Sequence, residues 1–306
     1  LKKEGEFNSN WNYLKNIPNI SLVKGDVRVL KEITEATQGA EAIIHTAGQT
    51  AVTTSVTNPT EDFSVNAIGT FQTLEAARKN DVKSLVFCST NKVYGDNVNN
   101  VPLVEGEKRY SFGGDFTNGI PESYPIDHCK HTPYGTSKLT ADLYMQDHSH
   151  MYGLRTGVFR MSCMYGTRQL GLEDQGWVAW FAIAALLGKP LTIFGDGKQV
   201  RDVLYVSDLV EAYDKFLQSN HKHLVVNMGG GPDNTLSLLE YMEILERITG
   251  KTINKSFSDW RPSDQKVFVS DISKAKSLLD WKPTIGPEEG IQKMMGWIED
   301  NKEIMS

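Results

Sequence analysis

Ser84-Leu-Val-Phe-Cys-Ser-Thr-Asn-Lys-Val-Tyr-Gly95 is the stretch of sequence that decides the fold, because a short apolar run in it ends in hydroxyl and amide side chains. Such runs, flanked by polar turns, are typical of strands buried on both faces of a parallel sheet. In these sheets ligands bind at the carboxyl ends of the strands. Residues 84–88 are therefore predicted to form a strand, and Thr90 to lie at its ligand-binding end.

Similar apolar runs alternate with helical patterns on both sides of this stretch. Strands are predicted at 20–24, 42–46 and 156–160, and helices at about 30–37, 58–80 and 134–151. Pro59 suits the first turn of its helix, where its missing N–H is not needed. Alternating strands and helices predict an α/β protein with a doubly wound parallel sheet covered on both faces.

Beyond Arg160 the regular alternation fades and Gly and Pro become more frequent. Separate helices are predicted at about 174–187, 208–219, 237–249 and 288–300. This pattern is typical of a smaller α+β lobe joined to a doubly wound sheet. We expect a first domain over residues 1–163 and a second lobe over 164–306, with residues 200–222 packing back on the first domain.

A glycine-rich turn is missing from the start of the pattern. A nucleotide-binding sheet of this kind normally begins with a strand, a three-glycine turn and a helix whose N-terminal amides bind a pyrophosphate. The glycine cluster at 229–231 lies far downstream and is predicted to be a turn. A sheet without its central strand would expose unpaired backbone. We therefore expect the sequence to lack its first half-unit, on the order of 30–40 residues.

Composition narrows the classes of function. With 306 residues, 40% of them hydrophobic and 23% charged, the chain has ordinary globular composition. The net charge of −6 argues against nucleic acid as a partner. The longest apolar run, Gly176 to Leu187, is shorter than the roughly 18 residues that a membrane-spanning helix needs. The three cysteines imply no disulfide framework, so we expect a soluble cytoplasmic protein without a membrane partner.

A phenol and an ammonium lie one helical turn apart in Tyr134-Gly-Thr-Ser-Lys138. An adjacent cation favours the phenolate and is expected to lower the pKa of Tyr134, each unit corresponding to about 1.4 kcal/mol. Such a tyrosine can remove a proton from a substrate hydroxyl. In a chain with 11 tyrosines one such pair also arises by chance. The alternative is an ordinary pair of exposed helical side chains.

Three further segments can support this chemistry. Thr90 can donate a hydrogen bond to the oxygen that Tyr134 deprotonates, although a helix-capping role is equally compatible with its position. His45-Thr-Ala-Gly-Gln49 ends a predicted strand with small residues that allow a flat ligand to approach the backbone. Asp26 closes the strand predicted at 20–24 and can accept a hydrogen bond from an adenine amine, or be an ordinary loop aspartate.

Anion and metal ligands are the remaining candidates. Arg201 and Arg261 are candidates for binding a diphosphate, because a guanidinium bonds phosphate oxygens two at a time. Surface ion pairing is the more common role of a single arginine. The histidine pairs 148/150 and 221/223 and the cluster 128–131 lack the further ligands that a metal site requires. We expect no metal.

Together these motifs resemble the extended branch of the short-chain dehydrogenase/reductase superfamily, whose members modify nucleotide-linked sugars. The likeness is carried by His45-Thr-Ala-Gly-Gln, Asn66-Ala-Ile-Gly-Thr-Phe-Gln-Thr-Leu-Glu-Ala, Ser89-Thr-Asn-Lys-Val-Tyr-Gly, Tyr134-Gly-Thr-Ser-Lys and Phe159-Arg. The resemblance implies a Rossmann-like fold, NAD as cofactor, and catalytic roles for Tyr134, Lys138 and Thr90. The implied NAD site includes Tyr134 and Lys138 and also Asp26, Val27, Ala47, Gly48, Gln49, Asn66, Ser89 and Arg160.

Motifs of the second lobe are most similar to epimerases of CDP-linked sugars. They are Met164-Tyr-Gly-Thr-Arg-Gln169, Asp174-Gln-Gly-Trp-Val-Ala-Trp-Phe181, Gly197-Lys-Gln-Val-Arg-Asp-Val203 and Ser263-Asp-Gln-Lys-Val-Phe-Val-Ser-Asp271. The implied reaction inverts C2 of the sugar through a transient keto sugar, with NAD regenerated in each turnover. The implied substrate contacts are Thr90, Asn91, Lys92, Gln169, Gln175, Arg201 and Arg261.

Other functions remain open from the sequence. Related 4,6-dehydratases carry an Asp-Glu pair after the catalytic threonine, where this chain has Asn91 and Lys92, so dehydration is disfavoured. UDP-sugar 4-epimerisation is the enzymatic alternative. A non-catalytic sugar-nucleotide-binding protein is an alternative of another class. The resemblance also implies a homodimer or homotetramer formed through the helices near 58–80 and 134–151.

Overall fold

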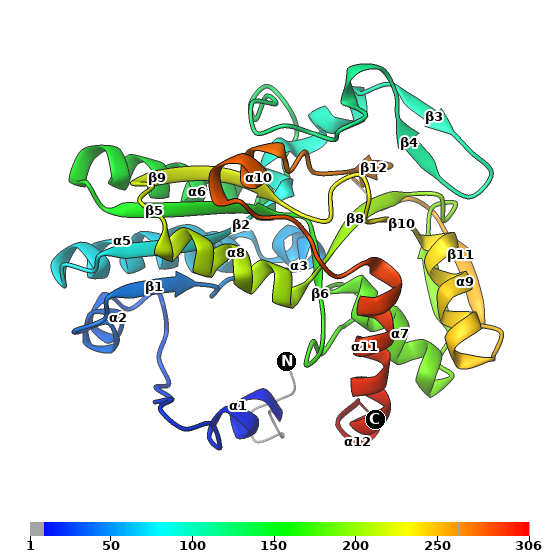
Figure 1. The fold of residues 1–306 in the computed structure, drawn as a ribbon, viewed down its shortest axis with the longest axis horizontal. Helices are drawn as coiled ribbons and strands as arrows, with labels where there is room; N and C mark the ends of the chain where they lie inside the picture. Colours follow the sequence, from blue (N-terminus) through cyan, green and yellow to red (C-terminus); the bar gives the residue numbers. More distant parts are fainter. Residues whose placement is uncertain (1–8, 262–263, 306) are drawn as a thin grey trace.

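The computed structural model describes residues 9–261 and 264–305. Its main sheet has four strands in the order β1 (Ala42–His45), β2 (Ser84–Thr90), β5 (Arg155–Met161) and β9 (His223–Met228). All neighbouring pairs are parallel. The predicted α/β class and parallel sheet are confirmed, and Figure 1 shows this sheet beside a second, mixed part of the chain.

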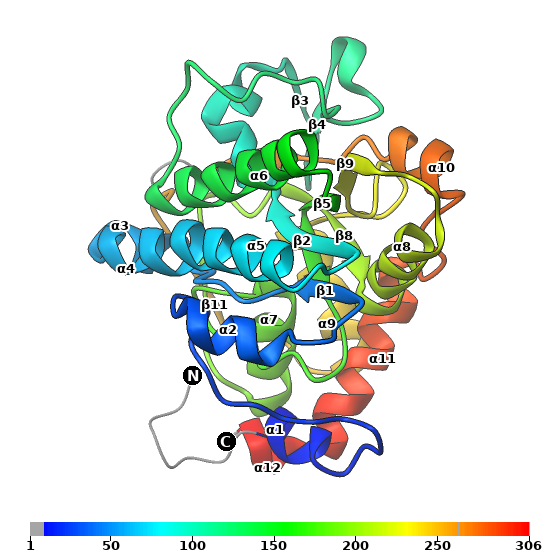
Figure 2. The same cartoon turned by 90° about the vertical axis from the view of Figure 1, so that its left-hand side faces the viewer.

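Alternating side chains of β2 supply both faces of this sheet, as expected for a strand with a period of two. Leu85 and Phe87 pack with α5 (Gly69–Lys79) and α6 (Pro133–Tyr152). Val86 and Cys88 pack on the opposite face with α8 (Val206–Gln218) and α10 (Ser273–Leu279). Figure 2 shows α5 and α6 side by side over their face of the sheet. The strand is therefore buried along its whole length.

The helix predicted at 58–80 forms with an irregular turn in its middle. It begins as α4 (Pro59–Phe63), whose preceding Asn58 side chain accepts a hydrogen bond from the N–H of Glu61. A π-helical turn, η1 (Ser64–Ile68), then leads into α5. Such turns frequently occur at functional sites. Two shorter helices, α2 (Leu30–Ala36) and α3 (Val52–Thr57), flank β1 in the sequence.

The strand predicted at 20–24 is wrong. These residues form no ladder, and the side chains of Ile20 and Val23 are 42% and 68% exposed. A β-strand requires a neighbour that accepts and donates its backbone hydrogen bonds. In the described part of the chain β1 is an edge strand that pairs only with β2, and only α1 (Ser9–Leu14) and α2 precede it. The segment at 20–24 therefore makes no backbone ladder, and the second edge of β1 is left unpaired in the described part of the chain.

The second part of the chain is a mixed α+β structure, as predicted. A sheet of β10 (Thr235–Ser237), β8 (Val200–Tyr205) and β12 (Val267–Phe268), with β6 (Cys163–Tyr165) on β8, lies beside the pair β7 (Leu191–Phe194) and β11 (Lys255–Ser258). Helices α7 (Trp177–Leu187), α9 (Leu238–Thr249) and α11 (Pro287–Asp300) enclose its apolar core. Smaller elements are η2 (Asn91–Asn100), β3 (Leu103–Glu105), β4 (Tyr110–Phe112), η3 (Gly114–Phe116) and α12 (Lys302–Met305).

The chain returns from the second part to the main sheet. Leu209 and Phe216 of α8 pack on this sheet. β9 then extends the sheet by pairing with β5. Gly157 of β5 permits this packing, since a Cβ there would lie 2.9 Å from the ring of Phe216. The division of the chain between residues 163 and 164 stays a prediction.

Candidate active site

Thr90, Tyr134 and Lys138 meet at the carboxyl end of β2. Helix α6 begins beside this strand, where Thr132 caps it by accepting a hydrogen bond from the N–H of Gly135 at 3.2 Å. The hydroxyl of Thr90 lies beside that of Tyr134 and favours its phenolate. The buried ammonium of Lys138 donates to the carbonyl oxygen of Cys88 at 2.5 Å. The structure thus brings the three residues with predicted catalytic roles together.

The prediction that the pKa of Tyr134 is lowered is wrong for the protein without bound NAD. Burial raises this pKa to about 12, although the hydroxyl of Thr90 acts in the opposite direction. Burial also lowers the pKa of Lys138 to about 8. An ammonium that is itself desolvated and bonded to a backbone carbonyl does not offset the cost of burying a phenolate. The phenolate therefore requires additional positive charge at neutral pH.

The loop after β1 lies beside the ammonium of Lys138. Asn66, in the π-helical turn, fixes this loop: its side-chain oxygen accepts from the N–H of Gln49 at 2.9 Å and its side-chain nitrogen donates to the carbonyl of Gln49 at 3.1 Å. A Cβ at Gly48 would lie 3.0 Å from Asn66 Oδ1 and 4.0 Å from Lys138 Nζ. Ala47 and Gly48 are exposed. Their small side chains leave the backbone open to a flat ring, which fits the nicotinamide half of NAD.

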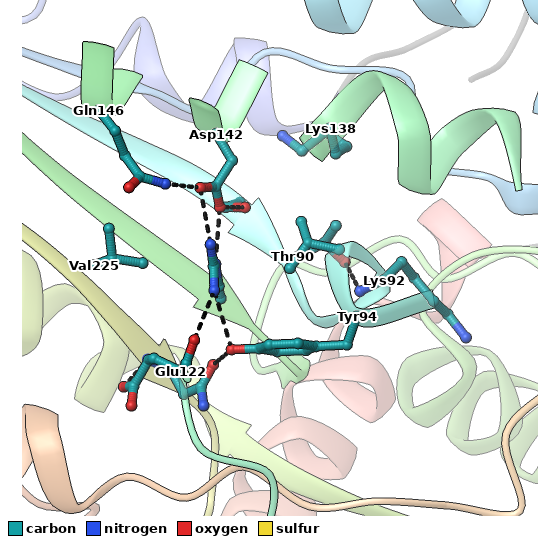
Figure 3. Close-up of polar contacts among 12 residues, drawn as sticks. Thr90, Lys92, Tyr94, Glu122, Lys138, Asp142, Gln146 and Val225 are labelled. Carbon is teal, nitrogen blue, oxygen red and sulfur yellow. Dashed lines mark hydrogen bonds and ion pairs between the residues drawn. The ribbon is translucent and has the colours of Figure 1, made fainter. Parts of the chain in front are cut away.

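Ser89 and Arg160 bond to Asp142 in a buried polar network, of which Figure 3 labels Asp142, Gln146 and Tyr94. Ser89 donates to Asp142 Oδ2 at 2.7 Å, and Arg160 Nε lies 3.0 Å from the same oxygen. Asp142 is fully buried, and Arg160 is 4% exposed. The roles of Ser89 and Arg160 in lining or supporting the NAD site stay predictions. Sequence reasoning missed Asp142, whose spacing of four residues from Lys138 was the available signal.

The same network continues toward the second part of the chain. Arg160 lies 3.4 Å from both the hydroxyl of Tyr94 and the carbonyl of Glu122. Tyr94 donates to Asn227 Oδ1 at 2.7 Å, and the N–H of Asn227 donates to Glu122 Oε1 at 2.6 Å. Helix α6 is thus connected through β5 and η2 to β9. These bonds hold the helix that carries Tyr134 and Lys138 in place.

Asp26 and Val27 lie beside the helix that carries Asn66. Both carboxylate oxygens of Asp26 accept hydrogen bonds from the guanidinium of Arg28, which lowers the pKa of this carboxyl. Arg28 is also 2.9 Å from Glu61 of α4. Val27 packs against Gly69, where a Cβ would lie 2.7 Å from the valine side chain. The roles expected for Asp26 and Val27 in binding NAD stay predictions.

A cleft of about 650 Å³ lies between the end of β2 and the second part of the chain. Its lining includes five of the seven residues expected to bind substrate, namely Asn91, Lys92, Gln175, Arg201 and Arg261. Arg201 Nη2 lies 2.9 Å from Asp264 Oδ1, and Arg261 Nη2 lies 3.5 Å from Asp174 Oδ1. Trp177, Phe181 and Phe194 add apolar walls that the sequence did not predict.

The two other expected substrate residues do not line this cleft. Thr90 is not part of its lining, and its side-chain oxygen accepts from the backbone N–H of Lys92 at 3.3 Å. Gln169 donates to the carbonyl of Met164 at 3.3 Å, while its side-chain oxygen is buried without a hydrogen-bond partner. Gln169 lies close to Gly176 of the cleft wall, since a Cβ on that glycine would be 3.1 Å from Gln169 Nε2.

Metal sites and membrane-spanning helices are two further features for which the described residues can be searched. Within residues 9–261 and 264–305 no group of three or more His, Cys, Asp or Glu side chains is arranged to hold a metal ion. In the same part of the chain no helix combines the length and the apolar character needed to span a membrane.

Comparison with known proteins agrees with this geometry. CDP-paratose 2-epimerase of Salmonella typhi is 41% identical over 298 residues, which are 94% of this chain and 87% of that protein. The structure of UDP-glucose 4-epimerase from Thermotoga maritima with UDP-glucose superposes with a TM-score of 0.80 at 28% identity, covering 94% of this chain and 88% of the other.

Two further matches bear on the family. UDP-glucose 4-epimerase from Thermus thermophilus, solved in complex with NAD, gives a TM-score of 0.77 at 28% identity over 93% of this chain and 87% of the other. A model of the NAD dependent epimerase/dehydratase family matches residues 3–229. The chain therefore belongs to the NAD dependent epimerase/dehydratase family.

Proposed function

We propose that this protein is an NAD-dependent nucleotide-sugar epimerase that inverts C2 of a CDP-linked sugar, of the CDP-paratose/CDP-tyvelose type. One observation carries the proposal: the cleft lined by Arg201 and Arg261 also includes Asn91, which follows Thr90, and Pro133, which precedes Tyr134. A sugar bound through its diphosphate would thus reach a proton acceptor. The similarity to CDP-paratose 2-epimerase supports CDP as the nucleotide.

Tyr134 is the group that takes and returns the proton of the sugar hydroxyl. Thr90, whose hydroxyl lies beside that of Tyr134, orients the sugar hydroxyl. Lys138 is held by the Cys88 carbonyl next to Gly48 and supplies one positive charge. When bound, NAD supplies a hydride acceptor and donor for the sugar carbon and a further positive charge that favours the phenolate.

Arg201 and Arg261 anchor the diphosphate while the keto sugar turns its other face. Both line the cleft, and within residues 9–261 and 264–305 each is paired with a single carboxylate, so guanidinium N–H groups remain for phosphate oxygens. The cleft volume of about 650 Å³ leaves room for a sugar to reorient. Asn91 and Lys92 provide no carboxylate, which disfavours elimination of a sugar hydroxyl.

The test is turnover of CDP-linked and UDP-linked sugars followed by NMR of the sugar ring protons. We expect the C2 proton of a CDP-linked sugar to change its coupling pattern, and the Tyr134→Phe variant to lose this activity. Inversion at C4 of UDP-galactose alone would instead favour the UDP-sugar 4-epimerase, to which the Thermotoga maritima structure is similar. Binding without any turnover would identify a non-catalytic sugar-nucleotide-binding protein.

We further propose that the protein is a homodimer or a larger homo-oligomer assembled through α5 and α6. These adjacent helices expose apolar side chains: Phe71 is 37%, Tyr144 is 42% and Leu143 is 48% exposed. The rings of Phe71 and Tyr144 meet edge to face at 5.3 Å. Exposed apolar clusters of this kind mark association surfaces. Light scattering should give a multiple of the chain mass, and Leu143→Glu should reduce it to one chain.

A further inference from the structure

Lys92 lies between the redox centre and the arginines of the cleft. It follows Thr90 by two residues, and its backbone N–H donates to Thr90 Oγ1 at 3.3 Å. Its side chain lines the cleft together with Arg201. Figure 3 shows its amine on the opposite side of Thr90 from the buried carboxylate of Asp142. Lys92 thus extends from the catalytic end of the cleft toward its cationic wall.

The ammonium of Lys92 is short of negative charge. Among residues 9–261 and 264–305 it has no carboxylate within salt-bridge distance, and its hydrogen bond is to the neutral Gln265 Oε1 at 3.4 Å. The charged and titratable groups that face it are Arg201, Asp264 and Cys163. Asp264 is already 2.9 Å from Arg201. Two cations therefore share one carboxylate in a largely buried cleft.

A neutral hydroxyl cannot balance this excess of positive charge, whereas a phosphate can. The sugar must lie at Tyr134 to be oxidised, so the phosphate that carries it lies nearer to Thr90 than the second phosphate does. Lys92 starts at Thr90 and ends beside Arg201. Burial and the proximity of Arg201 lower the pKa of Lys92 to about 8, which is the expected signature of a cation without a counterion.

We infer that Lys92 binds the sugar-bearing phosphate of the nucleotide sugar jointly with Arg201, a role that rests on the proposed function. The ligand then links η2, next to the redox centre, to β8 of the second part of the chain. Related 4,6-dehydratases carry a carboxylate at the position of Lys92. In this chain the same position supplies a ligand for phosphate. Lys92 is in this sense a residue that determines where the sugar stands relative to Tyr134.

Calorimetric titration of the NAD-loaded protein with CMP, CDP and a CDP-linked sugar tests this inference. Lys92→Met should lower the binding affinity for CDP and for the CDP-linked sugar alike, by about 10-fold or more, because a charged hydrogen bond is lost. It should leave CMP, which lacks the second phosphate, within about 2-fold. Lys92→Arg should restore most of the CDP affinity. Lys189→Met, an exposed lysine, is the matched control for loss of charge.

The pH dependence of CDP binding gives a second readout. The ammonium form binds phosphate, so wild-type affinity should fall as pH rises above about 8. Lys92→Arg should remove this fall, because arginine stays charged throughout. The NAD content of each variant, read from its absorbance, and its melting temperature show that the site is intact.

The outcomes separate the inference from the proposed function. Unchanged CDP affinity in Lys92→Met overturns the inference, and loss of affinity only for the CDP-linked sugar assigns Lys92 to the sugar instead. If the wild-type protein binds UDP and not CDP, the assignment of cytosine as the base is wrong. The role of Lys92 is then tested in the same way with UMP and UDP. A wild-type protein that binds neither diphosphate overturns the proposed function and the inference with it.

Discussion

The two ends of the candidate site differ in how completely their charges are paired. Behind the redox centre, Asp142 is fully buried and bonded to Ser89, Gln146 and Arg160. In the cleft, the Arg261–Asp174 pair is 3.5 Å long, and its side chains are 32% and 51% exposed. The first end is fixed before any ligand binds. The second end retains bonding capacity that a ligand can use.

The largest effect is expected at the redox centre. Tyr134→Phe removes the proton acceptor and retains the ring, so the turnover rate should fall by about 10²–10⁴-fold with little change in stability. The rate of sugar inversion at saturating substrate measures this. Tyr152→Phe, on the exposed end of the same helix, should be unaffected. Equal rates for Tyr134→Phe and wild type would show that Tyr134 is not the proton acceptor, so the chemistry could not be assigned to this end of the site.

Stability should separate the two ends next. Asp142→Asn leaves Arg160 buried without a counterion and should lower the free energy of unfolding by about 3–5 kcal/mol. Asp174→Asn, whose partner Arg261 is partly exposed in the cleft, should lower it by about 1 kcal/mol or less. Urea unfolding of both variants compares them directly. Similar losses would show that the two ends are equally rigid.

Acid should destabilise the redox end through His45. Burial, followed by the charge of Lys138, lowers the pKa of His45 to about 3. Thr70 donates to the carbonyl of Asn66 at 2.6 Å, so His45 Nε2 donates to Thr70 at 3.0 Å and the ring is neutral. The unfolded chain takes up a proton below about pH 6.5 and the folded chain does not.

This contribution to stability is therefore complete above pH 6.5 and is lost as pH falls toward 3, by at most about 1.4 kcal/mol per pH unit. Melting temperatures between pH 7 and 5 should fall less steeply for His45→Gln than for wild type. His150→Gln serves as the control. A parallel fall in all three proteins would place the acid sensitivity elsewhere in the molecule.

The smallest effect is expected at the exposed arginine of the cleft. Arg261→Met should raise KM for the nucleotide sugar by about 10-fold, because a partly solvated phosphate contact is lost. Its kcat and melting temperature should stay close to those of wild type. Steady-state kinetics separates the two parameters. A fall in kcat at constant KM would mean that Arg261 acts on the reaction centre and not on binding alone.

Local patterns predicted the elements that carry the site. The apolar run of β2 and the Pro133 start of α6 are visible in the sequence, so the meeting of Thr90, Tyr134 and Lys138 followed from them. Neighbouring residues of a strand point to opposite faces. The side chain of Ser89 therefore points to Asp142, on the other face of the strand from Thr90.

The sequence-based predictions that were wrong or incomplete concern features that depend on contacts between segments far apart in the chain. The segment at 20–24 has strand-like residues, but a strand exists only where a neighbour pairs with it. The pKa of Tyr134 is set by burial and not by its spacing from Lys138. The ion pair of Asp142 and Arg160 joins α6 to β5, and no local pattern in the sequence predicts which side chains of these two elements meet.

The π-helical turn at Ser64–Ile68 gives its helix one residue more than regular winding would use. Deleting a single amino acid there would restore ordinary winding and would rotate the preceding side chains by about 100° relative to those that follow. Asp62 and Asn66, which now both bond Ser137 of α6, could no longer do so together. The number of residues in this helix is thus constrained as tightly as their identity, even at solvent-facing positions.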